Sequence, residues 1–332
     1  MNVQLLDKFS PPLGNWYAPI QDDLERTKKI FDDELISDLP LVNEFCQRVR
    51  AYRGKMLRPA LLLLSGKACG ELTPAHHTLA AVVEMVHIAT LVHDDVLDEA
   101  DERRGRPTIC STDGNVAAVL LGDCLISHAF HLCSSLESQF ASRRVGAATN
   151  TVCEGELLQN HLRGRDTVDE TTYFEIVRRK TGALTAVACE LGSHYAGASP
   201  EVVRATASFG TSAGVAFQII DDVLDVTGER ETIGKTLGLD LALGKLTLPT
   251  IHCLAHADAQ TASALREVLG GRRTFTREEI GGWLDATNSI DYARSVAAQH
   301  VERALGHLES IPPGDAKDSL TAMARFIIDR RF

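Results

Sequence analysis

Two acidic clusters of the same sequence are the residues best suited to chemistry. Both read Asp-Asp-Val-Leu-Asp, and their acidic residues are Asp94, Asp95 and Asp98 in the first and Asp221, Asp222 and Asp225 in the second. An apolar run precedes each cluster, and in a helix its first and last aspartates lie on one face, where like charges repel. Paired carboxylate oxygens at this spacing suit Mg²⁺, which commonly shares its coordination shell with substrate phosphates. Two such clusters therefore predict a metal-dependent site for a phosphate-bearing substrate.

Basic residues stand near both clusters in the chain, as a diphosphate site requires. Forked arginine donors match phosphate oxygens, and lysine adds a point charge. The candidates are Lys55, Arg58, Arg103, Arg104, Lys180, Lys235 and Lys245. His87 lies two helical turns before Asp94, on the same face, where it can donate a hydrogen bond to a phosphate. Each alone would be read as a surface cation or a core histidine, but together around two acidic clusters they favour diphosphate binding.

The segments that must position these residues are predicted to be helices. Small clusters of glycine and proline separate long segments, and strand patterns of period 2 are nearly absent. Within 79–97, for example, Leu79, Val82, Val83 and Val86 repeat at three and four residues. We expect helices at about 21–35, 40–52, 55–69, 74–99, 114–135, 137–163, 167–197, 200–227, 246–268, 276–286, 290–310 and 315–330. Because no break in composition divides the chain, the prediction is one all-α domain over residues 1–332.

Length, charge and composition exclude several classes of protein. The chain has 332 residues and a formal net charge of −11, which argues against a nucleic-acid binder. Hydrophobic residues make up 44% and charged residues 24%, ordinary values that exclude global disorder. No uninterrupted apolar run reaches the roughly 18 residues of a membrane span, and the N-terminus lacks a secretion signal. The eight cysteines contain no C-x-x-C pair, so we expect the reduced thiols of a cytoplasmic protein.

The motifs and their order resemble those of the trans-isoprenyl diphosphate synthases, the polyprenyl synthetase family. They run from 54 to 249 and comprise Gly54-Lys55-x-x-Arg58-Pro59, His87 with the first acidic cluster, Arg103-Arg104-Gly105, Gly122-Asp123, Lys180-Thr181, Phe217-Gln218 with the second cluster, Gly234-Lys235 and Gly244-Lys245. The resemblance implies the isoprenoid synthase type I fold, a large helical bundle around a central cavity, and a homodimer. Residues 1–40 carry no motif, and we expect them to form a packing segment.

The resemblance also implies roles for individual residues. The direct ligands of about three Mg²⁺ ions are expected to be Asp94, Asp98 and Asp221, with support through water from Asp95, Asp222 and Asp225. Contacts with an allylic diphosphate are expected from Arg103, Lys180, Lys235 and Lys245. The isopentenyl diphosphate site is expected to comprise Lys55, Arg58, His87 and Arg104. The polar groups that stabilise the developing allylic cation are expected to be Thr181 and Gln218.

The residues below the first cluster bear on the length of the product. In short-chain family members an aromatic residue stands five or four positions before the first aspartate, where this chain has Ala89 and Thr90. We therefore expect a medium- or long-chain synthase, of hexaprenyl to octaprenyl type, with a C30–C40 product. The alternative is a geranylgeranyl (C20) diphosphate synthase, in which Phe130, Leu125 or the partner subunit closes the tunnel. A peripheral contact with a membrane would serve product release.

Three other functions remain as alternatives. A class I terpene cyclase shares the fold and the first motif, but it lacks the isopentenyl site and usually replaces the second cluster by an Asn/Ser/Glu motif. A non-catalytic subunit of a heteromeric prenyl synthase typically loses one acidic cluster, whereas this chain keeps both. A Mg²⁺-dependent diphosphatase would hydrolyse an allylic diphosphate without needing isopentenyl diphosphate.

Overall fold

The computed structural model of the chain describes residues 15–228 and 238–330. Its helices are η2 (Asn15–Ile20), α1 (Gln21–Glu34), α2 (Pro40–Tyr52), α3 (Leu57–Cys69), α4 (Pro74–Leu97), α5 (Ile109–Asp113), α6 (Asn115–Ser134), α7 (Phe140–Leu162), α8 (Glu170–Val177), η3 (Arg178–Gly182), α9 (Ala183–Tyr195), α10 (Pro200–Thr227), α12 (Leu239–Ala242), α13 (Leu248–His256), α14 (Ala259–Leu269), α15 (Arg277–Ala286), α16 (Ser289–His307) and α17 (Asp315–Asp329). Two short antiparallel strands, β1 (Glu102–Arg103) and β2 (Arg106–Pro107), form a hairpin after α4. The predicted all-α class is confirmed.

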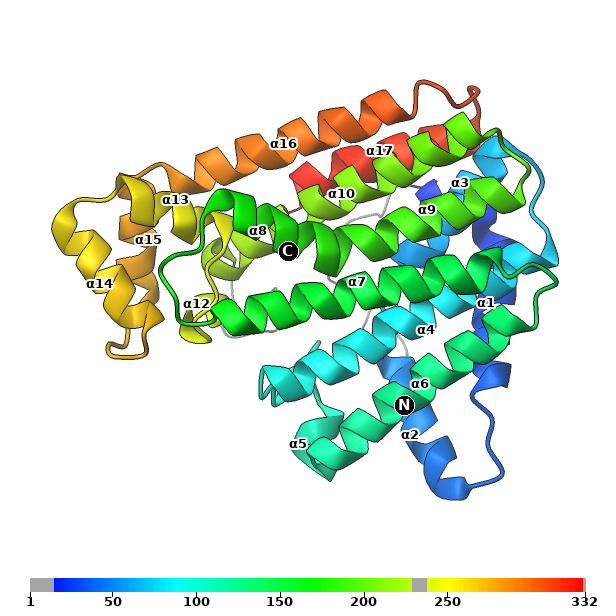
Figure 1. Ribbon diagram of the computed structural model, residues 1–332, viewed down its shortest axis with the longest axis horizontal. Helices are drawn as coiled ribbons and strands as arrows, with labels where there is room; N and C mark the ends of the chain where they lie inside the picture. Colours follow the sequence, from blue (N-terminus) through cyan, green and yellow to red (C-terminus); the bar gives the residue numbers. More distant parts are fainter. Residues whose placement is uncertain (1–14, 229–237, 331–332) are drawn as a thin grey trace.

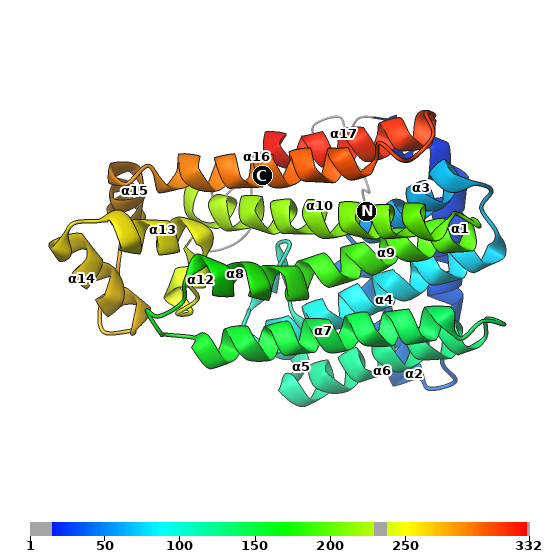
Figure 2. The same ribbon diagram turned by 45° about the horizontal axis from the view of Figure 1, so that its top comes forward.

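The long helices lie along one axis of the molecule. Figure 1 and Figure 2 show α4, α6, α7, α9, α10 and α16 extending along this axis, with α12–α15 gathered at one end and α1 crossing near the other. Helices α4 and α10 run in the same direction (Figure 1). The acidic clusters at their C-terminal ends therefore lie toward the same end of the bundle.

Local sequence signals start both cluster-bearing helices. Before α4, Thr73 forms a capping box with His76, and Pro74 stands at the first helical turn. Before α10, the Ser199 side chain accepts a hydrogen bond from the backbone of Val202, and Pro200 again follows. Because these caps fix the first residue of each helix, the length of the apolar run that follows determines where the acidic cluster lies along the helix.

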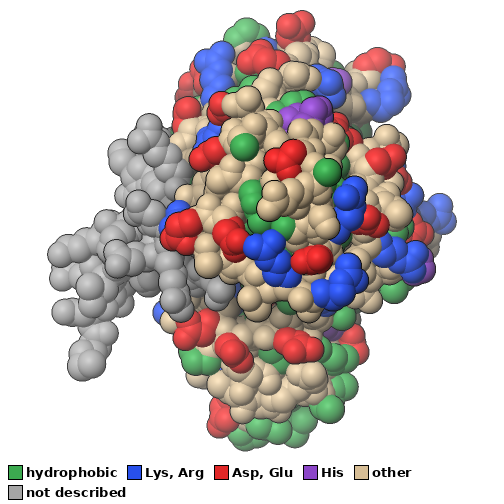
Figure 3. All heavy atoms as spheres, turned by 90° about the vertical axis from the view of Figure 1, so that its left-hand side faces the viewer, with side chains coloured by type: hydrophobic (Ala, Val, Ile, Leu, Met, Phe, Trp, Pro, Cys, Tyr) green, Lys and Arg blue, Asp and Glu red, His purple; other side chains and the backbone are tan. Residues whose placement is uncertain are grey.

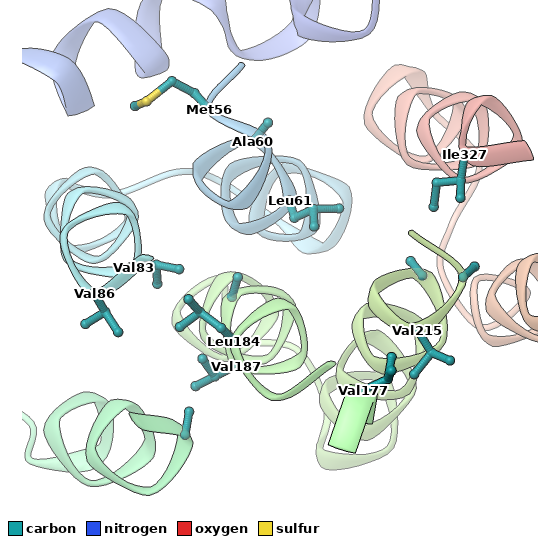
Figure 4. Close-up of a cluster of buried hydrophobic side chains, with 14 of the residues drawn as sticks. Met56, Ala60, Leu61, Val83, Val86, Val177, Leu184, Val187, Val215 and Ile327 are labelled. Atoms are coloured by element: carbon teal, nitrogen blue, oxygen red, sulfur yellow. The ribbon is translucent and has the colours of Figure 1, made fainter. Parts of the chain in front are cut away.

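The buried side chains form one continuous cluster that extends from Ile20 to Ile327. Figure 4 shows its central part, where Ala60 and Leu61 of α3, Val83 of α4, Leu184 of α9 and Val215 of α10 come together. This continuity is what we expect of the single domain predicted over the whole chain.

Glycines allow the central helices to approach closely. A Cβ at Gly122 of α6 would lie 2.1 Å from Nε2 of His93 on α4, and a Cβ at Gly210 of α10 would lie 2.4 Å from the carbonyl oxygen of Thr185 on α9. No side chain fits at either position without movement of its neighbour. The Gly122-Asp123 motif therefore has a packing role in the contact between α4 and α6.

Two helices are long and apolar enough on average to cross a membrane, although neither contains an uninterrupted apolar run of that length. They are α4, with 72% of its most apolar window buried inside the protein, and α6, with 33% buried. The expectation that no apolar run reaches this length holds, and the two helices qualify by their mean hydropathy. The burial of α4 is that of a core helix, whereas α6 keeps an open apolar face.

The helix boundaries agree with the sequence prediction except at a few points. The segment predicted as 246–268 contains a break at Ala257, after which Asp258 caps α14 by accepting from the backbone of Thr261. The segment predicted as 167–197 contains a π-helical turn, η3, between α8 and α9. The hairpin β1–β2 and the short helices η2, α5 and α12 were not predicted.

Candidate functional site

The middle aspartate of the first cluster is buried and held by three elements. Asp95 is 1% exposed, and its Oδ2 accepts a hydrogen bond of 2.9 Å from the Tyr52 hydroxyl of α2. Its Oδ1 lies 2.6 Å from Nη2 of Arg103 in β1, and the Tyr52 oxygen itself accepts from the backbone of Ile109 in α5. Asp95 therefore fixes the hairpin and Arg103 against the end of α4.

The outer aspartates of the first cluster are partly exposed and face lysines. Lys245, which precedes α13, donates a 2.7 Å hydrogen bond to Oδ1 of Asp98. Burial raises the pKa of Asp94 to about 6, which the nearby Lys180 opposes and Glu156 reinforces. The shared face of Asp94 and Asp98 is thus directed toward cations contributed by distant parts of the chain.

The second cluster repeats the buried middle aspartate with different partners. Asp222 is 4% exposed and accepts hydrogen bonds from the Tyr173 hydroxyl at 2.6 Å and from the Gln218 amide at 2.9 Å. Burial and the neighbouring Asp240 raise the pKa of Asp222 well above its ordinary value. Both partners are neutral donors, so no cation contacts this buried carboxyl within the described hydrogen bonds and ion pairs.

The outer aspartates of the second cluster lie against two later segments. Asp221 pairs with Nη1 of Arg330 at 2.7 Å, and the Arg330 guanidinium also lies 4.1 Å from the centre of the Phe217 ring. Asp225 accepts from the backbone of Leu239 and Asp240 at 3.3 Å, at the start of α12. The C-terminal end of the chain and α12 therefore both meet the end of α10.

The π-helical turn η3 carries Lys180 and Thr181. Turns of this type inside helices are frequent at functional sites, because they redirect side chains. The ammonium group of Lys180 pairs with Glu156 and donates to Oε1 of Gln159 at 2.5 Å. Burial lowers the pKa of Lys180, but Glu156, Asp94 and Asp98 outweigh it, so the lysine stays charged beside the first cluster.

A chain of hydrogen bonds joins η3 to the second cluster. The Thr181 hydroxyl donates to Oε1 of Gln218 at 2.8 Å, and the Gln218 amide donates to Asp222, which also binds Tyr173. Thr181 and Gln218 are thus brought together, as the sequence predicts. The chain orders four polar groups next to Lys180 and fixes the orientation of the Gln218 amide.

The predicted isopentenyl site lies at the start of α3. Met56 occupies the left-handed region with φ 53°, and Arg104 does so with φ 54°, conformations that are uncommon for residues other than glycine. Arg104 donates to the carbonyl oxygen of Tyr52 and packs on Gly54, where a Cβ would lie 2.6 Å from its Nη2. A side chain at Gly54 would therefore displace the Arg104 guanidinium from this position.

The charges of this loop act on one another and on the second cluster. Burial lowers the pKa of Arg58, while Glu84 and Asp221 oppose the change. Burial, with the positive charges of Arg58, Arg104 and Arg103, lowers the pKa of His87 well below its ordinary value, so His87 is neutral at pH 7. A neutral imidazole among arginines can still donate one hydrogen bond to an anion.

The carboxylates suit a hard metal ion that arrives with substrate. Among the described residues, no three histidine, cysteine, aspartate or glutamate side chains form a ready-made metal cage. Asp94, Asp98 and Asp221 are partly exposed oxygen donors, the set that Mg²⁺ takes when phosphate oxygens and water complete its shell. Lys235, predicted to contact the diphosphate, lies outside the described residues.

The candidate chain-length residues lie inside the bundle below the first cluster. Ala89 is fully buried, and the Thr90 hydroxyl donates to the backbone oxygen of His87 at 2.8 Å. Of the two residues considered as closures from α6, Leu125 is fully buried but Phe130 is 36% exposed. Phe130 is therefore a poor candidate, because its ring lies on the outer side of α6 next to α7.

Several residues of this site had not been identified from the sequence. Tyr52 and Tyr173 hold the buried aspartates, Arg330 pairs with Asp221, and Glu84 is buried beside Arg58. Only Glu84 carries a signal in the sequence, because it interrupts an apolar helical pattern. The others carry no such signal, and folding alone brings them to the aspartates.

Comparisons with known proteins agree with this geometry. The profile of the polyprenyl synthetase family matches residues 39–284. An all-trans-nonaprenyl-diphosphate synthase (geranyl-diphosphate specific) of Rhodobacter capsulatus is 36% identical over 94% of this chain and 96% of its own. An octaprenyl diphosphate synthase of Haemophilus influenzae is 34% identical over 100% of this chain and 98% of its own.

A solved structure extends the likeness to the whole fold. The polyprenyl synthase of Caulobacter crescentus, crystallised with calcium and isoprenyl diphosphate, superposes with a TM-score of 0.92 at 30% identity and covers 96% of this chain and 98% of its own. These matches confirm the predicted all-helical isoprenoid synthase fold. The chain belongs to the polyprenyl synthetase family of prenyltransferases.

Proposed function

We propose that this protein is a Mg²⁺-dependent trans-prenyltransferase that condenses isopentenyl diphosphate with an allylic diphosphate to form an all-trans polyprenyl diphosphate. The observation that carries the proposal is the pairing of two acidic clusters with a separate basic loop. Lys180 and Lys245 stand beside the first cluster, while Arg58 lies within the field of Asp221. The site could thus bind two diphosphates, one through metal ions at the acidic clusters and one through the arginine and lysine side chains of the basic loop.

Three of the four outer aspartates are the proposed metal ligands. Asp94, Asp98 and Asp221 keep partly exposed oxygens, whereas Asp95 and Asp222 already bind tyrosine and a second donor, which supports an indirect role for them. When bound, about three Mg²⁺ ions would neutralise the charge that develops on the departing diphosphate. For Asp225, which binds the backbone of α12, we propose the same supporting role.

The remaining charged residues divide between the two substrates. Arg103, Lys180 and Lys245, with Lys235, would bind the allylic diphosphate and stabilise the negative charge as its C–O bond breaks. Lys55, Arg58, His87 and Arg104 would hold the diphosphate of isopentenyl diphosphate. Thr181 and Gln218 present oxygen atoms that would stabilise the allylic cation. The double bond of isopentenyl diphosphate attacks this cation, and the departed diphosphate takes the proton that is then lost.

The product would be long, about C30–C40. Below the first cluster, α4 presents Val82, Met85, Val86 and Ala89, all fully buried, with no aromatic ring among them. The growing chain would follow this side of α4, and a dry apolar path also protects the cation from water. The relatives named for octaprenyl and nonaprenyl products support this length. A C20 product is the alternative, with Leu125 as the closing residue.

We propose a homodimer that forms through α6. Its side chains Val116, Val119 and Leu120 are 74%, 41% and 63% exposed, and such apolar patches commonly mark protein interfaces. Figure 3 shows hydrophobic side chains gathered at the lower edge of the molecule, on the side where α5 and α6 lie in Figure 1. A second copy of this chain is the occupant that we propose. We place the enzyme in the cytoplasm, with peripheral membrane contact only for product release.

One assay tests the proposed reaction. The purified protein is incubated with Mg²⁺, labelled isopentenyl diphosphate and a C10, C15 or C20 allylic primer, and the dephosphorylated product is sized. We expect labelled chains of C30–C40. Absence of incorporation with every primer contradicts the proposal, and a main product of C20 favours the alternative. Hydrolysis without incorporation would indicate a diphosphatase, and a cyclic hydrocarbon would indicate a cyclase.

A further inference from the structure

A third buried carboxylate lies outside both acidic clusters. Among the described residues, Asp95, Asp222 and Glu84 are the buried carboxylates, and Glu84 is 2% exposed in the middle of α4. It stands one helical turn before His87, in a segment that is otherwise apolar. A buried carboxylate is costly unless a cation or hydrogen-bond donors accompany it. Its position next to the predicted isopentenyl site therefore calls for an explanation.

The surroundings of Glu84 are cationic. Burial raises the pKa of Glu84, and Arg58, Arg104 and Arg53 oppose the rise. Arg53 is also paired with Asp32 at 3.0 Å, whereas the described ion pairs give Arg58 and Arg104 no carboxylate partner, and the charge of Glu84 acts on both of them. In the described part of the chain, Nε of Arg58 is buried and has no hydrogen-bond partner. Glu84 thus supplies the countercharge behind two guanidinium groups, while at least one donor of Arg58 remains unused.

The N-terminal segment also holds the loop. The hydroxyl of Tyr17, in η2, donates a 2.6 Å hydrogen bond to the carbonyl oxygen of Lys55. Burial and the charge of Glu84 both raise the pKa of Tyr17, so the phenol keeps its proton for this hydrogen bond. Met56, the next residue, has a left-handed backbone that surrounding contacts must maintain. Tyr17 and Glu84 therefore both act on this loop, Tyr17 through a hydrogen bond to its backbone and Glu84 through its charge.

We propose that Glu84 and Tyr17 are positioning residues for the diphosphate of isopentenyl diphosphate. Glu84 holds Arg58 and Arg104 in place through their charge, and Tyr17 fixes the backbone at Lys55. Neither residue touches the substrate. The proposal deepens the proposed function, on which it rests, and it gives η2 a role in substrate affinity.

The main test is Glu84→Gln, which keeps the shape and removes the charge. We expect its KM for isopentenyl diphosphate to rise about tenfold or more, with KM for the allylic diphosphate and kcat within about twofold of wild type. Glu190→Gln is the matched control, because Glu190 pairs with Arg144 at 2.6 Å on a different part of the surface. A role in folding alone would not separate the two KM values.

Tyr17→Phe provides a second, independent variant. Loss of the hydrogen bond to Lys55 should raise KM for isopentenyl diphosphate about threefold, again without change for the allylic substrate. Tyr292→Phe is its control, since the Tyr292 hydroxyl binds Glu170 far from this loop. If Glu84→Gln does not fold, Tyr17→Phe still decides the question. Equal KM values for both substrates in the variants and wild type would overturn the proposal.

A binding measurement separates this proposal from the proposed function. Titration calorimetry with isopentenyl diphosphate alone should show weaker binding to Glu84→Gln and Tyr17→Phe than to wild type. If the wild type incorporates label but the variants bind isopentenyl diphosphate normally, only the positioning role fails. If the wild type neither incorporates nor binds isopentenyl diphosphate, the proposed function fails, and the positioning role fails with it.

Discussion

The two acidic clusters have the same five residues but different surroundings. Asp95 is buried against a guanidinium and a tyrosine, whereas Asp222 is buried against a tyrosine and an amide. The guanidinium of Arg103 lies 2.6 Å from Asp95, while burial and the neighbouring Asp240 raise the pKa of Asp222. The charge of a motif is therefore set by the helices packed around it as much as by its own sequence.

The outer aspartates differ in a second way. Lys245 approaches Asp98 from the segment before α13, and Arg330 approaches Asp221 from the C-terminal end of α17. One turn before Asp221 stands Phe217, which Arg330 covers, while the equivalent position before Asp94 is Thr90. The space below the first cluster is thus lined by small and aliphatic side chains, and that below the second carries an aromatic ring. This asymmetry supports our proposal that the growing chain lies under the first cluster.

Removal of an outer aspartate should have the largest effect, and it should be large in both clusters. Asp94→Ala or Asp221→Ala is expected to lower kcat about a thousandfold or more, because charge stabilisation of the departing diphosphate is lost. Steady-state turnover with saturating Mg²⁺ measures the effect. Asp285→Ala, on the exposed side of α15, is the control. Near-normal turnover of either variant would contradict the role proposed for that cluster.

The buried aspartates should separate the clusters by stability. Asp95→Asn leaves Arg103, whose side chain is 17% exposed, without its countercharge and is expected to lower the free energy of unfolding by about 3 kcal/mol. Asp222→Asn keeps a polar side chain among neutral donors and should lower it by about 1 kcal/mol. Urea denaturation of both variants without metal or substrate measures the difference. Equal losses would show that Arg103 contributes nothing specific to the first cluster.

Blocking the space below the first cluster should change the product and leave the chemistry intact. Ala89→Phe places a ring about one turn below Asp94. The main product is expected to become shorter by about two or three isoprene units, because a close-packed interior leaves no room for the chain beyond the ring. Product sizing with the same primer measures the shift. Ala89→Val, with a smaller side chain, should shorten the product less. An unchanged product length in Ala89→Phe would remove the growing chain from this face of α4.

The sequence predicted the fold better than it predicted the surroundings of the clusters. Helical periodicity is local, so most helix bounds and the positions of Asp94 and Asp221 on their helices follow from it. The π-helical turn at Lys180 and the break at Ala257 do not follow from the sequence. Gly182 ends the turn, but a single glycine inside a helical pattern is tolerated, and no glycine or proline stands at the break. A cap such as Asp258 is visible only once the break is known.

The partners of the clusters could not be predicted for a physical reason. Tyr52, Tyr173 and Arg330 meet the aspartates through tertiary packing, and no spacing in the chain connects them. Glu84 is different, because a charge within an apolar helical face needs a buried partner. This interruption of the apolar pattern is the signal in the sequence that points to the arginine charges around Glu84.

The smallest expected effect concerns the ion pairs of the outer aspartates. In the pair of Arg330 with Asp221 the side chains are 15% and 37% exposed, so Arg330→Gln should lower the free energy of unfolding by about 1 kcal/mol or less. The side chains of Lys245 and Asp98 are 9% and 24% exposed, so Lys245→Gln should lower the free energy of unfolding by more than Arg330→Gln does. This loss of stability should persist at high salt concentration. Urea denaturation at low ionic strength and at about 1 M salt compares them, since the Debye length falls to about 3 Å there. If both losses vanish in salt, the two outer pairs are equally screened, and the clusters differ only in their buried aspartates and in the space below them.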